Sequence, residues 1–279
     1  MKFGFIGAGK VGFSLGKYLA DNEMEVVGYY SEFKEDALEA SKFTKSSVYK
    51  NIEDLVRDSD VLFLTVPDGA IEKVWNQVKK TGISGKVVCH CSGALSSKVF
   101  SDISELGGFG YSIHPLFAVS DRYNSYKELS NSYFTIEGSP EKIGEIRQIF
   151  EKMGNKICII SAKDKVKYHA AAAIASNLVV GLIDLSEKLL MECGFERDEA
   201  GDALAPIVWG NIKHILNNGV VEALTGPIER GDADTIKKHL AAISGNDKET
   251  YIAVSRQVLE VAKRKNKDRD YSKIEEILK

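Results

Sequence analysis

The spacing of apolar residues divides the chain into a first part that alternates strands with helices and a second part that contains helices only. Short apolar runs bounded by polar residues or glycine, typical of buried strands, recur up to residue 160. Stretches with helical spacing separate several of them, an order that predicts an α/β fold with a parallel sheet. The predicted strands are 2–6, 25–30, 60–66, 86–90, 110–113, 133–137 and 156–160, and helices are predicted through Leu15 and Leu19, at 70–79 and at 140–153.

No convincing strand pattern follows residue 161. The remaining apolar positions predict helices at 165–193, 197–217, 232–240 and 248–263. We therefore expect one domain at 1–161 and an all-helical domain at 162–279. Residues 170–173 are four consecutive alanines, which allow another helix to approach closely within the chain or at a dimer seam.

The first predicted strand ends in a glycine pattern of the form G-x-G-x-x-G. It reads Gly7-Ala8-Gly9-Lys10-Val11-Gly12 and lies between two predicted strands, with a helix beginning inside it. The first glycine permits a tight turn, the second lets a pyrophosphate approach the backbone, and the third allows the helix to pack closely on the strand. Free N–H groups at the helix N-terminus then face the phosphates. The pattern predicts a Rossmann domain that binds a dinucleotide.

The residue after the second strand bears on the choice between NADP and NAD. An acidic residue there would bind the ribose 2′-hydroxyl of NAD, but Ser31 occupies the position. Ser31 with Lys34 slightly favours NADP, whereas Glu32 would suit NAD.

Two further strand ends should face the cofactor, because ligands of such sheets lie beyond the carboxyl ends of the strands. The first is Val66-Pro67-Asp68, and the second runs from His90 to Ala94. Within the second, Ser92 is placed to hydrogen-bond a substrate carboxylate or the nicotinamide amide, and Gly93 is a substrate-site candidate. Ordinary turn chemistry remains an alternative for Pro67 and Gly93.

Composition narrows the class of protein. The chain has 279 residues, 44% of them hydrophobic and 28% charged, and a formal net charge of −3, values that argue against disorder and against a protein that wraps nucleic acid. No uninterrupted apolar run approaches the length of a membrane span, so we expect no membrane partner and a cytoplasmic location. The few scattered cysteines fit that compartment, and no pair of cysteines or histidines has zinc-site spacing, so no metal is expected.

The first helix of the second domain carries candidate catalytic groups. Lys165, His169, Ala173 and Asn177 recur every four residues and should share one helix face. A histidine titrates near neutrality, so His169 is the first choice of proton donor, with Lys165 second and Asn177 as an orienting donor. A histidine satisfied within a helix interface is the structural alternative.

Two other places could contact an anionic substrate. His114 follows a predicted strand and could line the same cleft as His90, although either could be an ordinary loop histidine. Thr225 and Arg230 lie in a polar, glycine-containing loop and could clamp a carboxylate, since a guanidinium grips it with two hydrogen bonds. Alternatively, Asp232 caps the next helix and Arg230 forms a structural ion pair.

Taken together, these segments resemble the Rossmann-like and DUF2520 domain proteins over nearly the whole chain. That group is similar to the 6-phosphogluconate dehydrogenase superfamily, which includes pyrroline-5-carboxylate reductases, ketopantoate reductases and β-hydroxyacid dehydrogenases. In several of these relatives a lysine and an asparagine one turn apart polarise the substrate carbonyl, whereas here His169 follows Lys165. The matching segments are Gly7 to Gly12, Val66 to Asp68, His90 to Ala94, His114 to Leu116, Tyr168 to Ala172, Ala175 to Asn177, Leu224 to Pro227 and Arg230 to Asp232.

The resemblance implies an NAD(P)-dependent oxidoreductase that transfers a hydride to the carbonyl or imine carbon of a small anionic metabolite, with a ketopantoate-like 2-oxo acid as the best guess. It also implies a homodimer. Two other classes fit the glycine pattern: a sensor or interaction protein that binds NAD(P) without turnover, and a transferase that uses S-adenosylmethionine.

Overall fold

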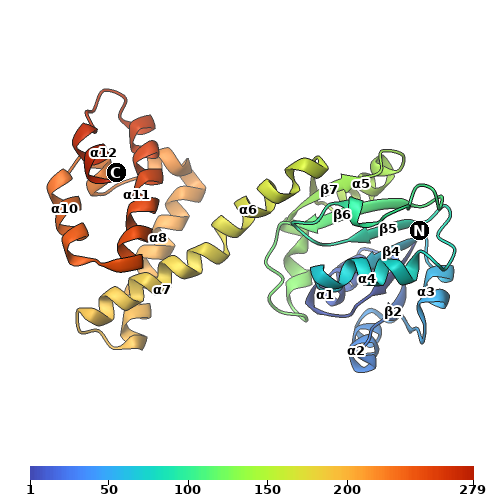
Figure 1. Ribbon diagram of the computed structural model, residues 1–279. Helices are drawn as coiled ribbons and strands as arrows, with labels where there is room; N and C mark the ends of the chain where they lie inside the picture. The colour runs from blue at the N-terminus through green and yellow to red at the C-terminus, as the bar shows by residue number, and fades with distance from the viewer. The chain divides into compact units, whose positions relative to one another are not determined.

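The computed structural model describes all 279 residues, which form two compact units, Met1–Asn177 and Leu178–Lys279 (Figure 1). The first unit is built on one sheet with the strand order β3-β2-β1-β4-β5-β6-β7-β8. Its strands are β1 (Lys2–Ile6), β2 (Glu25–Tyr30), β3 (Ser47–Val48), β4 (Val61–Leu64), β5 (Val87–His90), β6 (Phe109–Pro115), β7 (Tyr133–Gly138) and β8 (Lys156–Ile159). Each predicted strand is present, and β3 is an addition.

All neighbouring strands are parallel except β6 and β7, which pair antiparallel. The strand order reverses at β1, with β2 on one side and β4 on the other. Open α/β sheets bind ligands in the crevice beyond the strand ends at such a point. The expected α/β class with an N-terminal Rossmann sheet is confirmed.

Two apolar cores cover the two faces of the sheet. Alternate residues of a strand face opposite sides, so Phe63 of β4 joins one core and Leu62 joins the other. The first core is closed by α1 (Lys10–Asp21), α2 (Lys34–Thr44) and α5 (Ile143–Lys152), and the second by α3 (Ile52–Asp58) and α4 (Asp68–Val78). Short 3₁₀ turns lie at Ser97–Val99, Ser125–Asn131 and Ala162–Asp164.

Helix α6 (Lys165–Ala175) belongs to the first unit, which therefore extends beyond the boundary near residue 161 that the loss of strands suggested. The physical reason is Lys165, whose buried side chain is bonded to residues of the sheet and of a strand-end loop. The helix ends because Ser176 has φ −130° and ψ −81°, which is not helical.

The second unit is entirely helical. Its compact part packs around Ile236, Leu259 and Ile274. By contrast, α7 buries no residue and α8 buries only Ala200 and Ala223. The helices are α7 (Asn177–Glu192), α8 (Arg197–Ala223, with non-helical Gly219), α9 (Pro227–Arg230), α10 (Ala233–Ala242), α11 (Gly245–Lys265) and α12 (Ser272–Ile277).

One helical stretch, Ala162–Glu192, is long and apolar enough to cross a membrane when judged by length and composition, with a mean hydropathy of 1.4. The sequence analysis had expected no such run. The same stretch contains Lys165, which is hydrogen-bonded inside the first unit. This bonding favours a role in the protein fold over a bilayer span, and the cytoplasmic location stays a prediction.

Candidate functional site

The glycine turn between β1 and α1 has the geometry that a bound pyrophosphate requires. Gly7 has a φ of 97°, and a Cβ there would lie 2.7 Å from the Thr65 carbonyl oxygen. A Cβ on Gly12 would lie 2.4 Å from the Gly7 carbonyl oxygen, so only glycine lets α1 pack so close. The Cβ position of Gly9 has no heavy atom within 4 Å, which leaves room for a phosphate at the start of α1.

A cavity of about 450 Å³ opens beside this turn. It lies where β1, β2 and β4 end, which is the reversal point of the strand order. That is the position of dinucleotides in open α/β sheets. The lining residues are Ile6, Gly7, Ala8, Gly9, Tyr30, Ser31, Glu32, Phe33, Asp36, Ile52, Thr65, Val66, Pro67, Ala70, Lys73, Val74 and Gln77.

The cavity gathers many of the predicted cofactor residues, including the glycine turn, Ser31 and the end of β4. Lys10, Val11 and Gly12 form the first turn of α1 instead of lining the cavity. Lys34, the expected partner of a 2′-phosphate, is also absent from the lining. The charged groups that do line the cavity are Glu32, Asp36 and Lys73.

Arg122, which the sequence analysis did not single out, reaches the glycine turn from the loop after β6. Its guanidinium donates hydrogen bonds to the Ala8 carbonyl oxygen at 2.8 Å, to Asp36 at 3.0 Å and to Glu39 at 3.0 Å. It also lies over the Phe13 ring, 4.9 Å from its centroid. Arg122 therefore compensates the charge of Asp36 at the cavity wall and holds the loop against the turn.

The loop after β5 is held by the side chain of Ser92. The hydroxyl donates to Asp68 Oδ2 at 2.7 Å and accepts from the backbone N–H groups of Ala94 and Leu95 at 3.2 and 2.9 Å. Its proton is therefore engaged by Asp68 and not directed at a ligand. Asp68 directly follows Pro67 of the cavity wall, so this bond connects the cavity to the loop.

Lys165 is a deeply buried ionisable group of the site, with only 1% of its surface exposed. Its Nζ donates to the Ser92 carbonyl oxygen at 2.7 Å and to Ser112 Oγ at 2.6 Å. Burial lowers the pKa of the Lys165 ammonium to about 8, since desolvation disfavours the charged form. The predicted catalytic lysine thus ties α6 to β6 and to the loop after β5.

His90, at the end of β5, also bonds the loop that contains Ser92. It is fully buried, and its Nδ1 accepts a hydrogen bond from the Ser92 N–H at 3.2 Å. Its ring packs 5.4 Å from that of Phe100. Burial lowers the pKa of His90 to about 4, so the imidazole is neutral near pH 7, with its proton on Nε2.

Two more histidines meet above Gly93. A Cβ on Gly93 would lie 2.6 Å from His169 Nδ1 and 3.0 Å from His114 Nε2, so both rings converge on this backbone position. His114 Nδ1 lies 2.7 Å from the Tyr168 hydroxyl oxygen. Burial lowers the pKa of His114 to about 4, and the positive charge of Lys165 adds to this effect. The structure thus brings Gly93, His114 and His169 together, and their contact with a substrate stays a prediction.

Asn177 does not share the helix face with these groups. The four-residue spacing from Lys165 and His169 is interrupted where α6 ends, and Asn177 begins α7. Its side-chain oxygen accepts a hydrogen bond from Ser176. An orienting role for Asn177 stays a prediction.

Thr225 and Arg230 belong to the second unit. Thr225 lines a largely apolar groove of about 620 Å³ between helices of that unit. Asp232 accepts a hydrogen bond from the Thr235 N–H at 3.0 Å and so caps α10, which is the structural role considered for this loop. A role of Thr225 and Arg230 in binding substrate stays a prediction.

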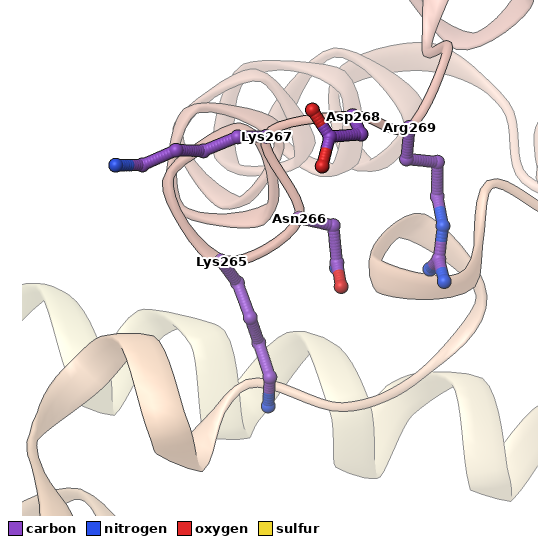
Figure 2. A pocket seen from close by; sticks show the side chains of 5 residues that line it. All are labelled: Lys265, Asn266, Lys267, Asp268 and Arg269. Atoms are coloured by element: carbon purple, nitrogen blue, oxygen red, sulfur yellow. The ribbon is translucent and has the colours of Figure 1, made fainter.

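Figure 2 shows a hollow around the turn between α11 and α12. Two of its basic side chains are engaged in the fold: Lys265 donates to the carbonyl oxygens of Glu222 and Leu224 at the end of α8, and Arg269 bonds Glu229. Cations at a helix C-terminus satisfy its free carbonyl groups. This hollow therefore has a structural explanation.

The cysteines near the site are not activated. Cys89 is buried, and burial raises the pKa of its thiol. Burial likewise raises the pKa of Cys91 to about 12, although Lys165 partly opposes the effect. Such thiols are protonated at neutral pH, which argues against a thiolate nucleophile. No group of three or more histidine, cysteine, aspartate or glutamate side chains is arranged to hold a metal ion.

The sequence analysis missed three contributors: Ser112, Tyr168 and Arg122. Ser112 stands two residues before His114, and alternation along β6 places both on the same face. Tyr168 follows Lys165 by three residues, close to one helical turn. These two spacings were available as signals, whereas nothing in the sequence around Arg122 indicated its contact with the glycine turn.

Two family models match consecutive parts of the chain, and the boundary between them lies inside the sheet, between β6 and β7. Residues 1–115 match the family model described as a Rossmann-like domain, and residues 132–258 match DUF2520, a domain of unknown function. The DUF2520 match begins at β7, so it includes Lys165, Tyr168 and His169. None of the curated proteins matches the chain.

Solved structures match the fold over nearly the whole chain. Protein TM1727 from Thermotoga maritima has a TM-score of 0.76 and 26% identity, over 95% of this chain and 99% of that one. A pyrroline carboxylate reductase from Plasmodium falciparum, solved with NADP bound, has a TM-score of 0.61 and 18% identity, over 96% and 97%. An imine reductase from Streptomyces aurantiacus has a TM-score of 0.65 and 13% identity, over 100% of both chains.

Proposed function

We propose that this chain, a Rossmann-like and DUF2520 domain protein, is an NAD(P)-dependent reductase. One observation carries the proposal: the Ser92 to Asp68 hydrogen bond joins the loop after β5, which Lys165 also bonds, to the wall of the cavity beside the glycine turn. A nicotinamide held by that turn and proton-bearing groups in the same unit are the two parts that hydride transfer requires. The fold shared with pyrroline carboxylate and imine reductases supports this reaction class.

The cofactor occupies the cavity, with its pyrophosphate on the open side of Gly9 and its adenosine ribose near Ser31. We propose NADP or NAD. Glu32 favours the free 2′-hydroxyl of NAD, whereas Lys73 and the pairing of Asp36 with Arg122 reduce repulsion of the 2′-phosphate of NADP.

The substrate is a small anionic metabolite that is reduced at a carbonyl or imine carbon, and a ketopantoate-like 2-oxo acid is the best single candidate. It lies above Gly93, where His114 and His169 contact it. The buried ammonium of Lys165 supplies positive charge beneath this position and keeps the loop of Ser92 in place. We propose that Asn177, Thr225 and Arg230 contribute to orienting the anion.

Fluorescence titration with NADPH, NADH and S-adenosylmethionine tests the proposal. We expect a reduced nicotinamide to bind, and its near-ultraviolet absorbance to decay with a 2-oxo acid or a cyclic imine. If neither nicotinamide binds, the proposal is wrong, and binding of S-adenosylmethionine alone would identify a transferase. Nicotinamide binding without turnover of any substrate in the panel would identify a sensor.

We also propose that the chain forms a homodimer through its second unit. Trp209, Ile212 and Leu216 recur at helical spacing along the part of α8 before the kink at Gly219 and are exposed, Trp209 by 73%. A large exposed apolar stripe is typical of a protein interface. Light scattering should give the mass of a dimer for the native chain and that of a monomer for Trp209→Asp, and a native monomer would contradict the proposal.

A further inference from the structure

The proposed reduction needs a proton donor, and two histidines stand at the same place. His114 Nε2 and His169 Nδ1 lie 3.0 and 2.6 Å from the position that a Cβ on Gly93 would occupy. Because glycine has no Cβ, both rings can approach the backbone there, and this brings Nε2 of His114 and Nδ1 of His169 to the same side of Gly93. The two rings are nearly perpendicular, at 88°, with centroids 6.4 Å apart. The rings of His114 and His169 differ in the hydrogen bonds that fix their orientation.

The ring of His114 is fixed by a second side chain. Its Nδ1 lies 2.7 Å from the Tyr168 hydroxyl oxygen, and the two rings meet edge to face with centroids 5.6 Å apart. His114 itself lies near the end of β6, opposite Thr135 of β7. The exposed ring of His169 has no comparable hydrogen bond to set its orientation or its tautomer. A fixed orientation favours His114 for proton transfer.

We propose that His114 Nε2–H protonates the reduced substrate and that Tyr168 returns a proton to His114 Nδ1. The inference rests on the proposed reductase function and adds its proton path. Hydride transfer from the nicotinamide carbon oxidises the cofactor and reduces the carbonyl carbon, whose oxygen becomes an alkoxide. The alkoxide takes the Nε2 proton while the Tyr168 hydroxyl gives its proton to Nδ1. The imidazole stays neutral, and the Tyr168 phenolate recovers a proton from water.

The surroundings keep His114 neutral before the reaction. Burial, Lys165 and His169 all disfavour a second proton on the ring, and only Asp68 opposes them. In the proposed state His114 Nδ1 accepts from the Tyr168 hydroxyl, so the neutral ring carries its proton on Nε2, the nitrogen closer to Gly93. His114 is thus a donor without needing to be an imidazolium.

Neighbouring side chains partly stabilise the negative charge of the phenolate that forms on Tyr168. Lys165 Nζ lies 5.8 Å from the Tyr168 ring centroid, so its positive charge stabilises the anion. Thr135, which hydrogen-bonds the Tyr168 hydroxyl, lowers the pKa of the phenol, although burial raises it overall. Tyr168 is only partly buried, so water can restore its proton.

The kinetic test compares His114→Gln, His169→Gln and Tyr168→Phe with the control Tyr133→Phe, an exposed tyrosine of β7. We expect His114→Gln to lower kcat by about 10² to 10⁴ fold at unchanged NADPH affinity, because a general acid is lost. Tyr168→Phe should lower kcat by about tenfold, and Tyr133→Phe should leave it unchanged. A His114→Gln variant with native kcat, or a larger loss for His169→Gln, would overturn the inference.

NMR of the histidine ring nitrogens tests the pair independently of turnover. At about pH 6 we expect His114 to be neutral with its proton on Nε2, and Tyr168→Phe to shift the tautomer population because Nδ1 loses its donor. A proton on Nδ1 in the native chain would overturn the inference even if the reductase function held. If no nicotinamide bound, the proposed function would fail, while this spectrum would still report on the His114 and Tyr168 pair.

Discussion

The two units bury their side chains in opposite ways. In the first, the sheet has an apolar core on each face, and even a lysine at the edge of the site, Lys165, is only 1% exposed. In the second, the core is confined to α9 to α12 and their neighbours, while α8 leaves Trp209 and Leu216 exposed by 73% and 79%.

This difference indicates that the first unit is suited to a reaction site and the second to a protein interface. Buried polar side chains that are hydrogen-bonded, such as Lys165 and Ser92, hold a fixed geometry, which a reaction site requires. Exposed apolar helix faces have no partner that fixes their side chains, but they can form an interface with another protein surface. We therefore expect changes in the first unit to alter cofactor binding and stability, and the matched changes at Gly210 and Lys213 of α8 to leave both nearly unaltered.

The largest effect is expected from Gly9→Val. The open side of Gly9 accepts a side chain without a clash in the free protein, but that side chain fills the position of the pyrophosphate. NADPH affinity should fall by about 100-fold or more, which is about 2.7 kcal/mol, with an unchanged melting temperature. The control is Gly210→Val on α8, where the space is also open, and its affinity should be native. Equal losses of NADPH affinity in Gly9→Val and Gly210→Val would contradict a cofactor site at the glycine turn.

Lys165→Met should lower the free energy of unfolding by about 2 to 3 kcal/mol. The methionine fills much of the volume but removes the donor to Ser112 Oγ, and it leaves the Ser92 carbonyl oxygen with only the longer bond from the Ser112 hydroxyl at 3.1 Å. Urea denaturation measures the loss. Lys213→Met, at an exposed lysine of the second unit, should change the free energy by less than about 0.5 kcal/mol. A stable Lys165→Met variant would contradict the structural role of the ammonium.

Mild acid should destabilise the first unit through His90. Its pKa is lowered from 6.5 to about 4 in the folded chain, so the unfolded chain binds more protons between these values. The free energy of unfolding should therefore fall as pH drops through that window, by about 1 to 2 kcal/mol for this group. His90→Gln, which does not titrate, should show a shallower pH dependence in denaturant titrations. An identical slope would show that His90 is not buried as a neutral group.

The smallest effect is expected from Arg122→Ala. Its loss leaves Asp36 uncompensated at the cavity wall and frees the loop after β6 from the glycine turn. NADPH affinity should fall by up to about tenfold, and NADH affinity by less, because only NADPH carries the 2′-phosphate. Isothermal titration calorimetry with both cofactors measures this. A larger loss for NADH would place the Asp36 carboxylate away from the ribose.

Elements of the fold that depend on a local sequence pattern could be predicted from the sequence. The glycine spacing from Gly7 to Gly12 defined the cofactor turn, and apolar runs located the longer strands. Helices α2 and α3 were not predicted, because each buries only a narrow apolar side. The break at Ser176 carries no proline or glycine, so the long helical pattern gave no sign of it.

For the site, the sequence predicted individual candidate residues but not the contacts between them. His114, His169 and Lys165 were candidates because of their residue types and strand or helix positions. Their partners depend on tertiary contacts: Lys165 bonds Ser92 and Ser112 across more than 50 residues of chain. Such pairing has no local sequence signal, which is also why Arg122 was not foreseen.

The most direct measurement of the central claim is isotope transfer from the cofactor. Reduced nicotinamide carrying deuterium at its hydride position is incubated with the protein and a panel of 2-oxo acids and cyclic imines, and the products are examined by mass spectrometry. We predict that a product gains one deuterium on the former carbonyl or imine carbon, and that Gly9→Val abolishes the gain. Tight cofactor binding with no deuterium in any product, or transfer that survives Gly9→Val, would contradict the account.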